Sequence, residues 1–368
     1  TRSRLRSVSQ ISRLMLKAKY IPYTLHFRQP AVTSRDILTR RDTYYLKIWH
    51  DEAPDCFGVG ECALFRGLGD DDKPDYEKRL ADLCDNINQS HSIDNIEWPE
   101  YTSICFGLET ALNDLQNGAK RIIYRSGWSQ GLDEIPINGL IWMGDARTML
   151  SRIDEKLNAG FRCLKLKIGG INFEEELDLL GYIRSKYPPE QLELRLDANG
   201  SFTPDNALSR LERLSRYGIH SIEQPIKPRQ YDAMRRLCNE SPIAIALDEE
   251  LIGLHATNDK TEMLDSIRPR YIILKPSLCG GFRSADKWIE LADERNIGWW
   301  ATSALESNIG LNAIAQWVST FDTTMPQGLG TGALYTDNIT SPIVQERDII
   351  RYDHKNGTWR LPEDISQP

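Results

Sequence analysis

The sequence contains no apolar run near the ~18 residues that a membrane-spanning helix needs. Its seven cysteines include no CxxC pair and no metal-type spacing, and their number is odd. This pattern is typical of reduced thiols and argues against a disulfide framework. The formal net charge of −8 disfavours nucleic acid as a main partner. We therefore expect a cytoplasmic protein with neither a membrane nor a nucleic-acid partner.

Acidic residues are absent from residues 1–13, which are rich in Arg and Ser. A targeting segment can have this composition, but no apolar signal core follows it. We interpret the segment as a solvated tail. The remaining composition is ordinary for a globular protein, with 40% hydrophobic and 27% charged residues. A length of 368 residues predicts two domains.

The first third of the chain predicts an α+β domain, which we place at residues 1–130. Runs of strands followed by helices are typical of this class. The Asp70–Asp72 cluster has no spaced ligand pattern around it, so we expect a solvated loop there and not a metal site. The β-rich runs and the helical patterns that follow them lie at about 14–29, 43–49, 58–63, 74–88 and 101–117.

From residue 131 onward, short apolar runs alternate with helical patterns. Eight such units fit into residues 131–339, and the last strand end is the glycine-rich Gln327–Gly332. This alternation predicts an α/β fold, a (β/α)8 (TIM-like) barrel, with the α+β domain as its cap. Residues 340–368 have a β-like pattern and are expected to return to the capping domain.

Charged side chains stand at the ends of five consecutive predicted barrel strands. The carboxyl ends of parallel strands meet at one mouth, where barrel enzymes keep their chemistry. Strands 2 and 6 of an eight-strand ring are opposite, so their lysines should face each other across that mouth. The carboxylates of strands 3, 4 and 5 fill the arc between them. The residues concerned are Lys165, Lys167, Asp197, Glu223, Asp248 and Lys275.

These residue types predict a metal-assisted proton transfer. Three carboxylates without His or Cys suit Mg²⁺, with Mn²⁺ as the alternative, better than zinc. Such an ion can stabilise the dianion formed when the α-proton of a carboxylate substrate leaves. Desolvation and a nearby cation favour a neutral lysine base, whereas the carboxylates favour a charged one. For any one of these residues, a structural salt bridge at the barrel mouth is the alternative.

Three polar neighbours complete the predicted site. Asn199 and Gln224 follow two of the carboxylates and are expected to orient them, and Asn199 is also a candidate substrate contact. Arg195 either bridges acids structurally or contacts the substrate. None of the six histidines stands at a predicted strand end with a partner.

With these residues in place, the chain resembles the enolase superfamily, in its muconate-lactonizing-enzyme subgroup, over nearly its whole length. The resemblance implies a metal-dependent enzyme that removes a proton next to a carboxylate. It is highly specific for the fold, the metal and the proton abstraction, and much less so for the overall reaction. The matching features are Lys165-x-Lys167, the ligands Asp197, Glu223 and Asp248, Lys275-Pro276, Gly280-Gly281, and segments 60–63 and 106–111.

Within that subgroup, segments 304–310 and 328–332 are most similar to o-succinylbenzoate synthases. These enzymes dehydrate a succinyl-hydroxycyclohexadiene carboxylate on the menaquinone pathway. The resemblance implies that Lys167 removes the α-proton and later helps the hydroxyl to leave. It also implies that Lys275 stabilises the enediolate from the opposite face and that Lys165 supports the carboxylate. Substrate selection would fall to Ala31–Ile37, Phe65–Gly69, Thr302 and Ser303.

Two other functions are weighed against this one. Dipeptide epimerases of the subgroup usually carry Asp-x-Asp at the last strand end, where this chain has Gly-Leu-Gly-Thr-Gly at 328–332. N-acylamino acid racemases lack such a signal and are the stronger alternative. A catalytically silent barrel kept for binding predicts loss of the charged set, and every member of that set is present.

Overall fold

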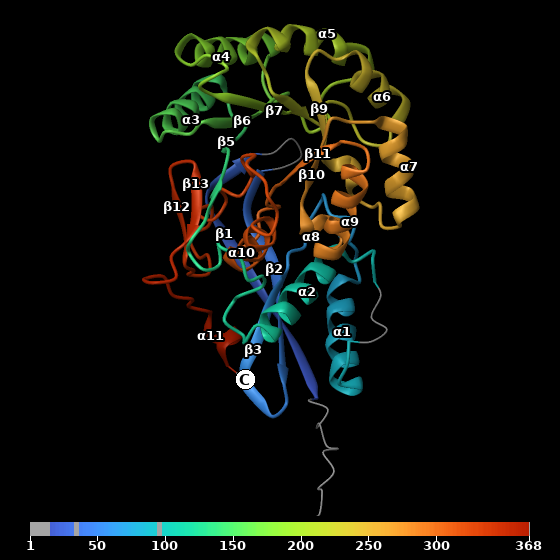
Figure 1. Cartoon of the computed structure of the whole chain (residues 1–368), viewed down its shortest axis with the longest axis vertical. Coiled ribbons are helices and arrows are strands. Elements are labelled where there is room, and N and C mark those ends of the chain that lie inside the picture. Colours follow the sequence, from blue (N-terminus) through green and yellow to red (C-terminus); the bar gives the residue numbers. More distant parts are fainter. Residues whose placement is uncertain (1–14, 33–36, 94–97, 368) are drawn as a thin grey trace, which may run out of the picture.

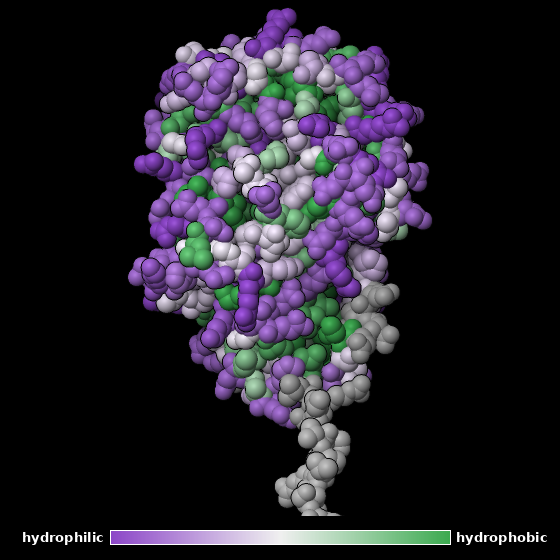
Figure 2. All heavy atoms as spheres, in the orientation of Figure 1, coloured by the Kyte–Doolittle hydropathy of each residue, from purple (hydrophilic) through white to green (hydrophobic). Residues whose placement is uncertain are grey.

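The computed structural model describes residues 15–32, 37–93 and 98–367 and consists of an antiparallel half and a parallel half (Figure 1). The basic segment 1–13 and residues 33–36 of the predicted substrate loop lie outside this described part. Hydrophilic residues cover most of the face shown in Figure 2. Among the described helices, none combines the length and the apolarity needed to cross a membrane.

The antiparallel half is a three-stranded sheet in the order β1-β2-β3, with two helices packed on it. Gly58 and Gly60 on β3 permit the close approach of α2, because a Cβ atom at either position would overlap a backbone carbonyl oxygen of that helix. The elements are β1 (Leu16–Val32), β2 (Ile37–His50), β3 (Ala53–Cys62), α1 (Tyr76–Ser90) and α2 (Thr102–Gln116).

The acidic loop between β3 and α1 is not simply solvated, contrary to the prediction for Asp70–Asp72. Asp71 is buried, and its carboxylate accepts hydrogen bonds from the backbone and the hydroxyl of Ser103 at 2.8 and 2.6 Å. These donors lie in the first turn of α2, where a carboxylate is stabilised by the helix dipole. The middle acid of the cluster therefore has a structural role.

The parallel half is a sheet of seven strands in sequential order, β5 to β11. Sequential parallel pairing requires a crossover after each strand, and the predicted helices supply it. The strands are β5 (Gly139–Ile141), β6 (Cys163–Lys167), β7 (Glu193–Asp197), β8 (Ser221–Glu223), β9 (Ala244–Leu247), β10 (Tyr271–Leu274) and β11 (Gly298–Ala301).

The helices that follow these strands have local signals that start and stop them. In α5 a capping box at Thr203 and a proline at the first turn mark the start, and Gly218, with φ of 60°, ends the short 3-10 turn (Ser215–Tyr217) that follows. The helices are α3 (Ala146–Asn158), α4 (Phe173–Lys186), α5 (Pro204–Leu214), α6 (Tyr231–Glu240), α7 (Thr257–Ile267), α8 (Pro276–Cys279), α9 (Gly281–Asp293) and α10 (Asn308–Val318).

The predicted eighth strand is a short bridging segment within the described residues. Gln327 forms a parallel bridge with Ile137, before β5, and Gly328 forms one with Thr302, after β11. The segment thus contacts both edges of the seven-stranded sheet without pairing as a full strand. The glycines of this segment were expected to end a strand. Glycine weakens a strand, so a regular ladder of backbone hydrogen bonds is disfavoured here.

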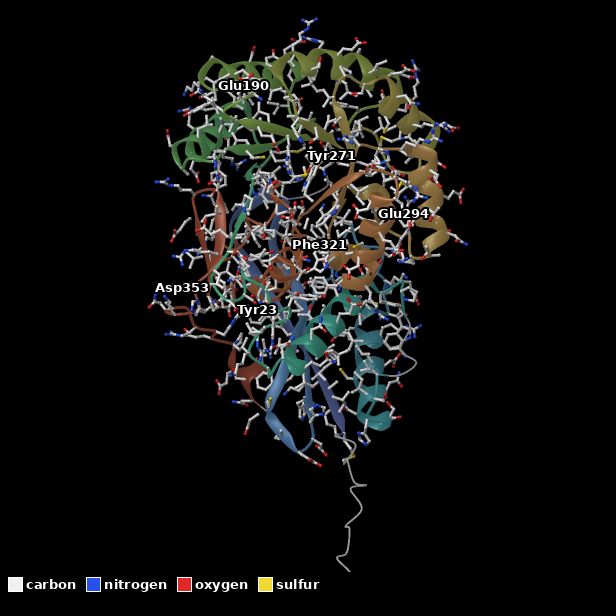
Figure 3. All side chains as sticks on the ribbon, viewed as in Figure 1. Tyr23, Glu190, Tyr271, Glu294, Phe321 and Asp353 are labelled. Carbon is white, nitrogen blue, oxygen red and sulfur yellow. The ribbon has the colours of Figure 1, made fainter. Side chains whose placement is uncertain are left out.

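Strand alternation separates an outer apolar layer from the interior of the sheet. Leu164, Leu166 and Leu194 belong to the large core shared with the surrounding helices. Ala246, Ile273 and Trp300 form a separate cluster. Tyr271, labelled in Figure 3, packs on Trp300 with ring centroids 5.4 Å apart. The charged strand ends share the inward parity of this second cluster.

The C-terminal segment divides its contacts between the two halves. β12 (Ile343–Glu346) and β13 (Ile349–Tyr352) form a sheet with β4 (Glu134–Pro136). They do not pair with the antiparallel sheet β1-β2-β3, which is called the capping sheet below. α11 (Glu363–Ser366) places Ile365 against residues of β1, β2 and β3. The division at residues 130 and 340 stays a prediction.

Candidate active site

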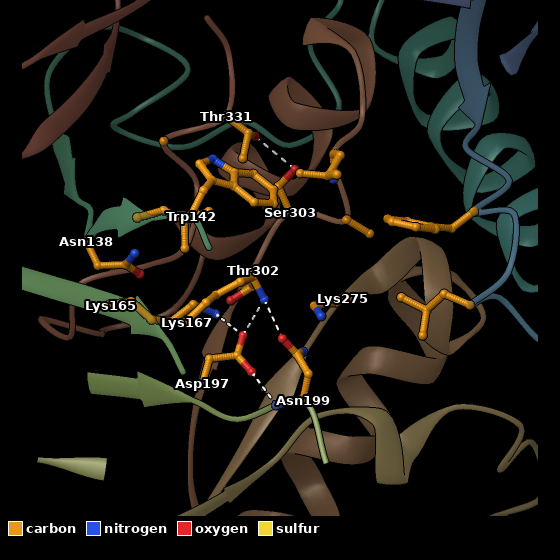
Figure 4. A pocket seen from close by; sticks show the side chains of 17 residues that line it. Asn138, Trp142, Lys165, Lys167, Asp197, Asn199, Lys275, Thr302, Ser303 and Thr331 are labelled. Atoms are coloured by element: carbon orange, nitrogen blue, oxygen red, sulfur yellow. Dashed lines mark hydrogen bonds and ion pairs between the residues drawn. The ribbon is translucent and has the colours of Figure 1, made fainter. Parts of the chain in front are cut away.

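A cavity lies at the carboxyl ends of the parallel strands. Its floor contains Lys165, Lys167 and Asp197, and Lys275 reaches it from the other side (Figure 4). Phe65 and Leu68 of the predicted capping loop also line it. The lysines therefore point into the cavity and not into the helix layer.

The two lysines of β6 are paired with strand-end carboxylates. The Lys165 ammonium lies 2.8 Å from Glu223 Oε2 and 3.4 Å from Asp197 Oδ2. Lys167 lies 2.8 Å from Asp197 Oδ2. Burial alone would lower the pKa of Lys165, but the charges of Glu223 and Asp197 outweigh burial and raise it. In this arrangement Lys165 is a fixed cation.

Lys275 stands directly after β10, four strands from β6 in the sheet order. Its ammonium donates to Asp248 Oδ2 at 2.5 Å. Burial would lower the pKa of Lys275, but the neighbouring carboxylates of Asp248 and Glu249 raise it. The cavity is thus bounded by cations on two sides.

The carboxylates come from three adjacent strands. Asp197 and Glu223 are register partners on β7 and β8, and Asp248 follows β9. The ammonium groups of Lys167 and Lys165 hold the pKa of Asp197 well below its usual range, against the effect of burial. Burial, reinforced by the charges of Asp197 and Asp248, raises the pKa of Glu223. The register of the parallel strands therefore places the three acids at neighbouring strand ends.

The oxygen ligands that these residues offer are of the type that a hard divalent cation prefers. Within the described residues, Glu223 Oε1 is buried without a hydrogen-bond partner, and all three acids offer oxygen atoms as metal ligands. Each of the three acids is turned toward a lysine. In the described part of the chain, no three His, Cys, Asp or Glu side chains are grouped so that they could hold a metal ion.

Asn199 connects one lysine to a further acid. Its side-chain oxygen accepts from Lys167 Nζ at 2.8 Å, and its amide nitrogen donates to Glu249 Oε1 at 2.9 Å. The residue has φ of 44°, a conformation that asparagine tolerates better than most residues. Glu249 was not singled out from the sequence, although it follows Asp248 directly.

Gln224 positions the backbone at Asp248. Its side-chain oxygen accepts from the backbone N–H groups of Asp248 and Glu250, both at 3.2 Å. Its amide nitrogen donates to Glu250 Oε2 at 3.0 Å. Gln224 therefore contacts Asp248 through the main chain of Asp248 and not through its carboxylate.

Arg195 does not line the cavity. It is fully buried, lies 2.6 Å from Glu193 Oε1 and donates to the Pro326 carbonyl oxygen at 2.8 Å. Its guanidinium carbon lies 4.3 Å from the centroid of the Trp300 ring. The sequence left a structural role and a substrate contact open for Arg195. These contacts correspond to the structural role, because Arg195 lies two residues before the strand end at Asp197.

Thr302 and Ser303 both line the cavity but differ in their hydrogen bonds. Thr302 Oγ1 is buried and has no hydrogen-bond partner among the described residues. The Ser303 hydroxyl donates to Glu306 Oε2 at 2.6 Å and accepts from Thr331 Oγ1 at 2.9 Å. Thr302 can therefore bind a ligand directly, whereas Ser303 shapes the wall.

Asn138 is a cavity residue that sequence reasoning missed. It is 4% exposed, and its Oδ1 atom has no hydrogen-bond partner in the part of the chain that the structure describes. The signal was available, because alternation along the predicted first strand gives Asn138 the same parity as the cavity residues Leu140 and Trp142. A polar residue at an inward position of a short apolar run is a candidate contact.

Comparison with known proteins identifies related chains. The model of the family "Enolase C-terminal domain-like" matches residues 148–363. An o-succinylbenzoate synthase from Desulfotalea psychrophila is 44% identical over 366 residues, which cover 91% of this chain and 98% of the relative. The crystal structure of MenC from that organism has a TM-score of 0.81 and 41% identity, and covers 91% of this chain and 99% of its own.

A more distant structure shares the fold. The dipeptide epimerase from Enterococcus faecalis, complexed with Mg and the dipeptide L-Leu-L-Tyr, has a TM-score of 0.77 and 18% identity. The match covers 92% of this chain and 97% of the epimerase chain. At this identity the likeness concerns the fold alone.

Proposed function

This chain belongs to the enolase C-terminal domain-like family, and on that premise we propose that it is an o-succinylbenzoate synthase. The reaction is the dehydration of 2-succinyl-6-hydroxy-2,4-cyclohexadiene-1-carboxylate to 2-succinylbenzoate, catalysed by a hydro-lyase. The observation that carries this proposal is the 44% identity to a synthase along 98% of that relative's length. The resemblance to the enolase superfamily predicted from the strand-end residues is confirmed.

One lysine carries out both proton transfers, and the other two act as positive charges. Lys167 in its neutral form takes the proton from the ring carbon that bears the carboxylate. The C–O bond then breaks on the same face, and the Lys167 ammonium returns a proton so that the hydroxyl leaves as water. Lys275 stabilises the negative charge on the opposite side, and Lys165 supports the carboxylate as a fixed cation.

Asp197, Glu223 and Asp248 would hold Mg²⁺, with Mn²⁺ as the alternative. When bound, a divalent cation supplies Lewis-acid stabilisation of the charge that develops on the substrate carboxylate. The oxygen-only donor set and the unpartnered Glu223 Oε1 support this assignment. Asn199 and Gln224 orient the site through Lys167 and the backbone of Asp248.

The remainder of the substrate meets a neutral polar wall. Asn138 and Thr302 flank the Gln327–Gly328 segment on its two sides and present unpartnered oxygen atoms. Gly328 keeps this wall open, because a Cβ atom there would lie 2.5 Å from Thr302 Oγ1. Asn138 Oδ1 can accept from a substrate hydroxyl, and the Thr302 hydroxyl can donate to a substrate carbonyl oxygen. Neither group carries the negative charge that would pair with an ammonium group.

The finer parts of the proposal concern architecture and location. The bridges at Gln327 and Gly328 support the interpretation of the sheet as a complete (β/α)8 barrel. All seven cysteines are free, which supports a reducing compartment such as the cytoplasm. The product places the enzyme in menaquinone biosynthesis.

N-acylamino acid racemisation and dipeptide epimerisation begin with the same proton removal and use the same lysines. Segment 328–332 carries no acid that could hold a substrate ammonium group, which counts against the free-amine substrates. The test is a product assay in Mg²⁺ with the hydroxycyclohexadiene carboxylate and, separately, with N-acylamino acids. We expect rapid formation of 2-succinylbenzoate. Efficient racemisation without any 2-succinylbenzoate would contradict the proposal.

A further inference from the structure

The loop between β11 and α10 holds a left-handed residue against the cavity. Leu305 has φ of 64°, and it is 7% exposed. A residue with a bulky side chain rarely adopts this conformation unless its surroundings enforce it. Ala304 and Leu305 both line the cavity that contains the lysines. The shape of this wall therefore depends on the contacts that hold the loop.

Three hydrogen bonds hold this loop around Leu305. The Tyr335 hydroxyl donates to the Leu305 carbonyl oxygen at 2.6 Å, and Leu305 N donates to Ser303 Oγ at 3.0 Å. The third comes from the other half of the molecule, where Arg41 Nη1 donates to the carbonyl oxygen of Ala304. Arg41 belongs to β2 of the capping sheet.

The same guanidinium holds a second wall of the cavity. Arg41 Nη2 donates to the carbonyl oxygens of Ala63 and Leu64 at 2.7 and 3.4 Å. The Arg41 guanidinium carbon lies 4.9 Å from the centroid of the Phe65 ring, and Phe65 lines the cavity. The planar fork of an arginine can bind several carbonyl groups and a ring face at once, which a lysine cannot do.

We propose that Arg41 is a positioning residue for substrate binding, which joins the capping wall at Phe65 to the barrel wall at Ala304–Leu305. Arg41 is 7% exposed and, within the described residues, forms no ion pair, although burial raises the pKa of Glu61 and the charge of Arg41 opposes that rise. The hydrogen bonds of Arg41 go to main-chain oxygen atoms of the two walls. Only the kinetic test of the role of Arg41 rests on the proposed function of the enzyme.

This role predicts a particular kinetic signature. The lysines and carboxylates stand on or directly after β6 to β10, whereas the two walls held by Arg41 belong to other segments that line the same cavity. We therefore expect these walls to contact parts of the substrate away from the reacting carbon. Loss of such contacts weakens the ground state and the transition state alike, so KM rises while kcat changes little. Partial unfolding has the opposite signature, because it removes active enzyme and lowers the apparent kcat at unchanged KM.

The test compares Arg41→Met with Arg40→Met in the full-length enzyme. Arg40 is the exposed neighbour on the same strand, so it controls for the loss of a cation from this surface. We expect Arg41→Met to raise KM for the hydroxycyclohexadiene carboxylate about tenfold with kcat within about threefold. Arg41→Lys should lie between, and Arg40→Met should match the wild type.

Hydrogen–deuterium exchange supplies a readout that needs no turnover. Arg41→Met should speed exchange of the amides in 63–69 and 302–307 and leave those of β7 unchanged. Tyr335→Phe, which removes only the hydroxyl on Leu305, should also raise KM and should speed exchange in 302–307 alone. Tyr335→Phe keeps the proposal testable if Arg41→Met does not fold.

The outcomes separate the two proposals. If the wild type gives no 2-succinylbenzoate, the proposed function fails, and the exchange experiment still decides the role of Arg41. If Arg41→Met shows wild-type KM and wild-type exchange in both segments, the positioning role is wrong. It is also wrong if kcat alone falls, or if exchange rises throughout the molecule.

Discussion

The hydroxyl of Ser307 donates a 2.6 Å hydrogen bond to Glu61 Oε2, although the two residues are 246 positions apart in the chain. Glu61 is the penultimate residue of the capping strand β3, and Ser307 is the N-cap of α10 in the parallel half. The backbone N–H groups of Ser307 and Gly310 also donate to the Glu61 carboxylate, both at 3.0 Å. An acid of one half thus caps a helix of the other.

Glu61→Gln should destabilise the folded protein. An amide offers one acceptor oxygen where the carboxylate offers two, and it loses the charge at the helix N-terminus. We expect the free energy of unfolding to fall by about 1–3 kcal/mol, as measured by urea denaturation. Glu52→Gln, at an exposed turn, is the matched control and should change it by less than about 0.5 kcal/mol. Equal values for the two variants would contradict the capping role.

Lys167→Ala should abolish dehydration. Lys167 Nζ donates to Asn199 Oδ1 at 2.8 Å, and no other amine of the cavity donates to that atom among the described residues. Removal of a positioned base typically costs about 10²–10⁴-fold in rate. The measurement is the rate of 2-succinylbenzoate formation, with Lys186→Ala, on the far end of α4, as the control. A variant with at least half of the wild-type rate would exclude Lys167 as the base.

Lys275→Arg should separate dehydration from racemisation. Arginine keeps the positive charge near the substrate but cannot lose its proton readily. Syn elimination needs proton transfer on one face only, so some dehydration should survive. Racemisation needs an acid and a base on opposite faces, so any racemase side activity should disappear. Retained racemisation of an N-acylamino acid by this variant would assign proton transfer to another group.

Glu223→Gln should weaken binding of the divalent cation. Glu223 supplies the buried, unpartnered oxygen atom between Asp197 and Asp248. Calorimetric titration with Mg²⁺ and Mn²⁺ should show a loss of affinity of about 10-fold or more. Glu240→Gln, on the exposed end of α6, should bind as the wild type does. Full activity of the wild type in excess chelator would exclude the metal assignment.

Gly328→Ala should raise KM with little change in kcat. The added Cβ atom would lie 2.5 Å from Thr302 Oγ1 and would push that hydroxyl from the neutral wall of the cavity. We expect a KM increase of about 5–50-fold, the size of one lost hydrogen bond. Gly332→Ala is the control in the same segment, because Gly332 does not line the cavity. Unchanged KM in Gly328→Ala would show that Thr302 does not contact the substrate.

The sequence by itself determined which side chains would gather at the mouth. Side chains alternate with a period of two, so Lys165, Lys167 and Asp197 had to share the inward face once their strands were assigned. Parallel strands present their carboxyl ends at one edge, so Glu223 and Asp248 had to join them. The first rule needs only a few consecutive residues, and the second needs only the repeated alternation of strands and helices along the chain.

Contacts between distant segments were decided only by the tertiary structure. Nothing near Arg195 in the chain indicates Trp300 or Pro326, and nothing near Asp71 indicates the first turn of α2. The tertiary structure also decided the form of the eighth unit. Its two single bridges to opposite edges of the sheet correspond to no pattern in the local sequence. The left-handed Leu305 depends on Arg41 and Tyr335 from two distant segments, as well as on Ser303 of its own loop. Local sequence specifies which face a residue takes, whereas the partner it meets there is set by how the whole chain packs.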